Sequence, residues 1–112
     1  MSFWRKEVID FALGQDTELR VQEQKAWIAA EPGNARPYYQ LGLLCRMQHQ
    51  RDAALGLLLH AISLDPELAP AHGALSEMYA ASGDLERARH HAARAEALGD
   101  PATAEQLRRH AG

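Results

Sequence analysis

The hydrophobic positions of the chain recur three and four residues apart, which is the spacing of one helix face, and short polar or Gly/Pro-containing breaks interrupt them. Alanine is common while Val, Ile, Phe and Trp are few, a composition that favours helices over a sheet. The predicted helices cover residues 2–13, 16–30, 36–47, 51–63, 67–82, 85–98 and 101–110.

The breaks have the residues that end and begin helices. We expect Gly14 to end the first helix and Asp16 to cap the second, because a carboxylate at that position accepts from unpaired backbone donors. Pro32 and Gly33 are unfavourable in a helix interior and end the second helix. Gly83 is expected to supply a left-handed turn in the same way further along.

One pattern occurs twice between residues 35 and 98. A shift of 34 residues places identical residues on one another: Ala35 on Ala69, Leu41 on Leu75, Ala54 on Ala88 and Ala61 on Ala95. Each copy contains two helix-length patterns with a polar break between them, so the unit is a helix–turn–helix. A fixed period of this length is typical of stacked repeats.

The residues at fixed places in each copy make the pattern more specific. The first copy has Tyr38, Leu41, Gly42, Ala54, Ala61, Asp65 and Pro66, and the second has Leu75, Tyr79, Gly83, Asp84, Ala88 and Ala95. This set resembles the tetratricopeptide repeat, or TPR. The second copy departs from it at His72, where an aromatic residue is expected, and at Ser76, where glycine is expected.

The resemblance implies an all-α fold, a right-handed α-solenoid of about three helix–turn–helix repeats plus a C-terminal capping helix. The single domain of residues 1–112 would then contain a divergent repeat at 1–34, two regular ones at 35–68 and 69–99, and a cap at 100–111. In the first repeat Trp4, Phe11 and Pro32 are in phase with the family pattern, but Arg20 and Trp27 stand where small alanines are expected.

Charge and cysteine content limit the classes of partner. The net charge is −3 and the pI is near 6.0, whereas a general nucleic-acid binder has a basic face and a high pI. A single cysteine cannot form an internal disulfide, which suits a reducing compartment and predicts a cytoplasmic protein. No apolar run has the length of a signal peptide core or a membrane span. We therefore expect no nucleic-acid or membrane partner.

Two sets of residues invite a chemical interpretation, and both have a simpler one. Cys45 and His49 are four residues apart, a spacing that could activate a thiol, but Cys45 aligns with the aromatic core position of the next copy. His90 and His91 are adjacent and point about 100° apart on a helix, so they cannot chelate a metal as an i, i+4 pair does. No phosphate loop or other catalytic motif occurs. We predict no enzyme activity, no cofactor and no metal.

The resemblance also implies a binding site, since the first helix of each repeat in that family lines a concave groove that holds a partner segment. The positions carried over are Arg5, Lys6, Ile9, Arg36, Tyr39, Gln40, Leu43, Arg46, Met47 and Glu77. The set has four cations and one acid around an apolar centre, which predicts a partner that is apolar with some acidic character. The Lys/Asn clamp of the chaperone-binding subtype is missing, because Ile9, Gln40 and Ala74 are among the residues at its positions.

An alternative function is self-association. The helix at 51–63 is apolar nearly all round, and Leu57 and Leu59 exceed what a repeat stack needs to bury. A protein-interaction scaffold and a homo-oligomerisation module, for example a homodimer, therefore both remain open.

Overall fold

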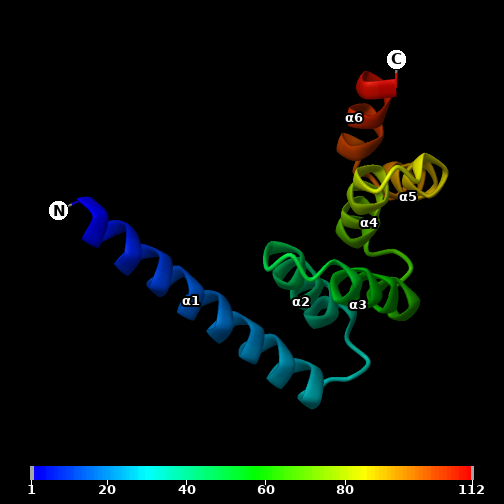
Figure 1. The fold of residues 1–112 in the computed structure, drawn as a ribbon. Coiled ribbons are helices and arrows are strands. Elements are labelled where there is room, and N and C mark those ends of the chain that lie inside the picture. The colour runs from blue at the N-terminus through cyan, green and yellow to red at the C-terminus, as the bar shows by residue number, and fades with distance from the viewer. Residues whose placement is uncertain (1, 112) are drawn as a thin grey trace.

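The structure is a computed structural model that describes the backbone of residues 2–111 and the side chains of residues 16–109. Within that range the chain is all-helical, as predicted, and has no strand (Figure 1). The helices are α1 (Ser2–Ala30), α2 (Ala35–Met47), α3 (Arg51–Leu64), α4 (Ala69–Ala81), α5 (Leu85–Ala97) and α6 (Ala102–Ala111).

Two helix pairs, α2 with α3 and α4 with α5, form the regular units of the molecule. Small residues allow the helices of each pair to approach closely. Ala54 and Ala61 in the first pair, and Ala88 and Ala95 in the second, are fully buried. At Gly42 an added Cβ would lie 3.0 Å from Leu58 Cγ, so only glycine fits at this crossing. The alanines that define the repeat in the sequence are therefore the contact points between its helices.

The core lies between these pairs and extends to the second half of α1. Leu41, Leu58 and Leu75 are its central side chains, and Val21 of α1 is buried among them. At the other end of the stack α6 packs on α5 and α4. Gly73 of α4 permits this second contact, because a Cβ there would lie 3.2 Å from Thr103 Oγ1 of α6.

The turns between paired helices share one geometry in both units. Gly83 has a φ of +86°, and His49, which stands 34 residues earlier, has a φ of +60° although it carries a side chain. Left-handed backbone of this kind disfavours residues other than Gly, Asn and Asp. Asn34 and Asp84 cap α2 and α5, and their side chains accept from the N–H groups of Arg36 and Arg87 at 3.0 Å and 3.1 Å.

The predicted turn at Gly14 is wrong: residues 2–30 form the single helix α1. A glycine inside a helix costs only about 1 kcal/mol relative to alanine, and no proline accompanies it. Folding the first half back against the second would also require small residues at positions 20 and 27, where the chain has Arg20 and Trp27. Neither side chain is buried. The helix therefore continues straight instead of reversing.

This straight helix makes the molecule elongated. The radius of gyration is 16.1 Å, whereas a compact domain of this length has about 13 Å. Figure 1 shows the N-terminal half of α1 projecting away from α2–α6, while its C-terminal half leads into the stack. Two complete helix pairs thus lie between a long first helix and a short last one.

Candidate partner-binding groove

The first helices of the two pairs, α2 and α4, carry most of the predicted groove residues. Met47 is exposed over 64% of its surface, and Tyr39 and Leu43 are half-buried against the core. Arg36 and Gln40 are exposed on the same helix. The side chains of Arg5, Lys6 and Ile9 lie outside the described residues, so the contribution of α1 to the groove stays a prediction.

An ion pair joins the two helices across the groove. Arg46 Nη1 lies 2.9 Å from Glu77 Oε2, and both side chains remain accessible to solvent. The two charges therefore compensate each other in the free protein, so Arg46 already has a carboxylate partner. A solvent-accessible pair of this kind contributes about 1 kcal/mol or less to stability. A carboxylate from a partner could replace Glu77 at small cost.

Two shallow hollows flank this ion pair. The first, which we call the α2–α4 hollow, is lined by Arg46, His49, Arg51, Met78 and Ala81 and has a volume of about 300 Å³. The second, the α4–α6 hollow, is lined by Ser76, Glu77, Ala80, Thr103, Gln106 and Leu107 and has a volume of about 200 Å³. Each hollow combines an apolar floor with polar groups, which suits a side chain of a partner segment better than a charged small molecule.

The α4–α6 hollow includes residues that the sequence prediction missed. Thr103, Gln106 and Leu107 belong to α6, which was expected only to cap the stack. A signal was present in the small residue Gly73, because a glycine in a helix interior often marks the close approach of another element. The repeat pattern itself does not extend to α6, so the pattern could not assign groove positions there.

Tyr39 is the aromatic side chain at the centre of the groove. Partial burial raises the pKa of its hydroxyl, and the negative charges of Glu77 and Asp100 raise it further. The phenol therefore stays protonated at neutral pH and can donate a hydrogen bond to a partner carbonyl or carboxylate.

Away from the groove, two histidines form a buried pair between α4 and α5. His72 Nδ1 lies 3.1 Å from His91 Nδ1, and His72 Nε2 lies 2.9 Å from the backbone carbonyl oxygen of Pro66. A carbonyl oxygen only accepts, so Nε2 of His72 carries a proton and donates it. In a neutral ring the Nδ1 of His72 is then an acceptor, and His91 donates to it from Nδ1. The two rings thus share one fixed direction of hydrogen bonding.

The surroundings of this pair favour the neutral form of His91. Its ring stacks on Tyr79 with centroids 5.7 Å apart, and the guanidinium of Arg87 lies over the other aromatic ring at 5.8 Å. Burial lowers the pKa of His91 to about 4, with smaller contributions from His72 and His90. We assign these residues to the interior of the second helix pair and not to the groove.

The residues considered for catalysis have the properties of structural groups. Cys45 is buried in the core, and burial raises the pKa of its thiol more than nearby Lys25 lowers it. A protonated thiol is a weak nucleophile. His49 is exposed in the turn after α2. Among the described residues no group of three or more His, Cys, Asp or Glu side chains could hold a metal ion.

Comparison with solved structures finds the same helical architecture in MamA proteins. A MamA structure from Desulfovibrio magneticus RS-1 is 29% identical, with a TM-score of 0.67, over 85% of this chain and 53% of that one. A crystal structure of MamA protein is 25% identical, with a TM-score of 0.66, over 83% of this chain and 49% of that one. The chain therefore spans about half the length of these proteins. No protein-family model and no curated protein sequence matches it.

No described helix is long and apolar enough to cross a membrane. The 34-residue period, the two closed helix pairs with alanines at their crossings and the structural likeness to MamA agree with one another. The chain is a helical solenoid of the TPR type.

Proposed function

We propose that this protein is a non-catalytic interaction scaffold that binds a segment of another protein in the groove along α2, α4 and α6. The segment has apolar side chains that enter the α2–α4 and α4–α6 hollows. Between them it presents a carboxylate or carbonyl group to Arg46 and Tyr39. A cytoplasmic location remains part of this proposal, on the basis of the single unpaired cysteine.

The observation that carries the proposal is the pair of hollows on either side of the Arg46–Glu77 ion pair. Apolar floors provide the anchoring area, and the ion pair provides a charged group that can change partner. Hot spots of protein interfaces commonly combine a buried apolar anchor with an arginine. The four cations of the predicted groove are reduced in effect by Glu77, so we expect acidic character in the partner to add selectivity and apolar anchors to supply most of the affinity.

The test begins with a random twelve-residue peptide library displayed on phage and selected against the intact protein. The Tyr39→Ala/Arg46→Ala variant is expected to bind the selected peptides at least tenfold more weakly by calorimetry, with an unchanged circular dichroism melting curve. Arg94→Ala, which changes an exposed arginine of α5, is the matched control and should bind normally. Equal affinity of wild type and the double variant would refute the groove assignment.

Glu77→Gln gives a second, opposite readout. It leaves Arg46 without its carboxylate partner, so acidic peptides should bind severalfold more tightly while neutral ones are little changed. If the gain were the same for both kinds of peptide, the arginine would have no role in selecting the partner.

Self-association is the second candidate function, and two observations favour it. The long helix α1 has its extensive contact with α2 alone among the helices of the chain. Leu59, Leu64 and Leu85 are exposed apolar residues on α3 and α5. Leu57, in contrast, is partly buried against the core. Light scattering over a range of concentrations separates the two functions, because a scaffold that only binds other proteins stays monomeric.

A further inference from the structure

The N-terminal half of α1 is a helix without a neighbour in its own chain. Figure 1 shows it projecting from the stack, and only the C-terminal half of α1 supplies members of the described core, namely Val21 and Ile28. The sequence of the projecting half has Trp4, Val8 and Phe11 four and three residues apart, which is the spacing of one helix face. A helix with such a face is stabilised mainly by packing that face against another element.

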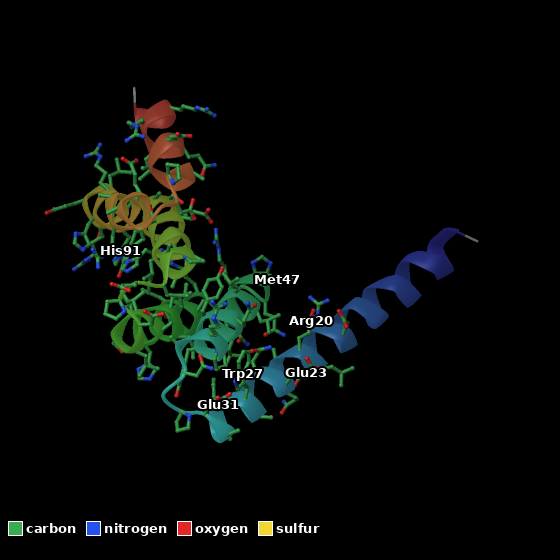
Figure 2. All side chains as sticks on the ribbon, turned by 180° about the vertical axis from the view of Figure 1, so that it is seen from behind. Arg20, Glu23, Trp27, Glu31, Met47 and His91 are labelled. Atoms are coloured by element: carbon green, nitrogen blue, oxygen red, sulfur yellow. The ribbon has the colours of Figure 1, made fainter. Side chains whose placement is uncertain are left out.

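The same spacing continues into the half of α1 that joins the stack. Four and three residues further on it reaches Gln22, Ala26 and Ala29, which are all exposed, and Leu19 beside them is exposed over 64% of its surface. This face is not the one that carries Val21 and Ile28 into the core. Figure 2 shows the exposed side chains from Arg20 to Glu31 following one another along this half of α1. The helix thus has large apolar residues at one end of a single face and small residues at the other end.

A second copy of the same helix, running in the opposite direction, matches this face at both ends at once. Residue Trp4 then stands opposite Ala29 of the other copy, Val8 opposite Ala26 and Phe11 opposite Gln22. Large residues meet small ones, which is how closely packed layers interdigitate. A two-fold axis near the middle of α1 makes both contacts identical, as in an isologous dimer.

Closure within one chain would bring the same two halves together, but the structure argues against it. Residues 2–30 are one continuous helix, and a reversal at Gly14 would need a short turn that holds the two halves close. Arg20 and Trp27 occupy the positions at which regular repeats have the fully buried alanines Ala54 and Ala61. Pairing between copies has no such turn, so the distance between the helices can adjust to larger side chains.

We propose that α1 forms an antiparallel two-fold dimer in which residues 2–14 of one copy pack along residues 19–30 of the other. The partner is a second copy of this chain, because only a helix with the same large-to-small order is complementary over the whole length. The dimer deepens the self-association candidate and does not rest on the groove. Loss of peptide binding in the groove would leave it intact.

The experiment uses the full chain with Cys45→Ala as background and two added cysteines, Val8→Cys and Ala26→Cys. A short bis-maleimide cross-linker at low micromolar protein should give covalent dimers on a denaturing gel. A cross-linked monomer would show that the first repeat closes on itself, and the absence of any cross-link would show that the halves do not pair. Either result overturns the proposal.

Light scattering with charge variants provides the second test. Wild type is expected to be a dimer at tens of micromolar, and Ala26→Arg should shift it to monomer by placing a charge in the contact. Ala93→Arg makes the same change at an exposed alanine of α5 and should leave the dimer unchanged. A wild-type monomer at these concentrations, or equal dissociation in both variants, contradicts the α1 contact. Peptide binding measured in parallel distinguishes this failure from failure of the groove.

Discussion

At the scale of single residues, the second helix pair differs from the first by a polar pair in its interior. His72 and His91 occupy the positions that Tyr38 and Leu57 hold 34 residues earlier. The two rings satisfy each other through one hydrogen bond, with Pro66 accepting the outer proton. This arrangement tolerates neutral rings, but two protonated rings would place two donors against each other.

The pH dependence of stability follows from the lowered pKa of His91. Its folded pKa is about 4 against an ordinary value of 6.5, so the unfolded chain binds the proton more readily between these values. The free energy of unfolding should be fully present above about pH 6.5 and fall as the pH drops toward about 4, by up to about 3 kcal/mol. Urea denaturation at several pH values measures this loss.

The matched control replaces the pair with the residues of the first unit, His72→Tyr with His91→Leu. This variant should lose less stability than wild type over the same pH range, because the buried imidazoles are gone. Parallel pH curves for the two proteins would assign the acid sensitivity to other groups.

Gln24 is a second residue with an unusual environment. Its Oε1 atom is buried and has no hydrogen-bond partner in the described structure, and the equivalent position in the next unit is the fully buried Leu58. Removing an unsatisfied buried acceptor stabilises a protein by about 1–3 kcal/mol. Gln24→Leu should therefore raise the unfolding midpoint, whereas Gln22→Leu, at an exposed position, should not. A lower midpoint for Gln24→Leu would show that the amide is satisfied.

At the scale of helices, two glycines test how closely α2 and α3 approach. Gly42 and Gly56 both lie inside helices, but a Cβ at Gly42 would meet Leu58 at 3.0 Å while one at Gly56 would meet nothing within 4 Å. The two positions should therefore respond in opposite ways to the same substitution.

Gly42→Ala is expected to destabilise the protein by about 1–3 kcal/mol, because the core is overpacked. Gly56→Ala should stabilise it by about 1 kcal/mol, since alanine is the better helix former and has room. Denaturant unfolding of the two variants decides the matter. Stabilisation by both would mean that the crossing is looser than the structure has it.

At the scale of the whole molecule, the extended shape separates α1 into a half that supports the fold and a half that does not. The support comes from Val21 and Ile28, which pack against the core cluster of α2–α4. Removing residues 1–14 should leave the free energy of unfolding of the monomer within about 1 kcal/mol of the intact chain.

Removing residues 1–30 should instead cost several kcal/mol, because Leu44 and Cys45 of α2 would lose their cover. Chemical denaturation of the two shortened chains below the concentration of dimer formation compares them. A large loss from the shorter deletion would place stabilising contacts in the first half of α1.

Most of the helices and the all-α class were predictable from the sequence because they depend on local features. Each of α2–α5 lies within about two residues of its predicted range, since apolar periodicity, caps and left-handed turns act over a few residues. The groove positions on α2 and α4 follow from the same register. The continuity of α1 was not predictable from Gly14, because a single glycine ends a helix only where the reversed chain finds a surface to pack on.

By itself, the sequence determined that small residues recur every 34 positions, and therefore that pairs of helices pack closely and stack. Only the tertiary structure decided that Arg46 pairs with Glu77, that His72 meets His91, that α6 lines a hollow and that α1 runs straight. These features join side chains from different helices or depend on what covers a helix face. Their energies come from competition among distant contacts, which no local pattern records.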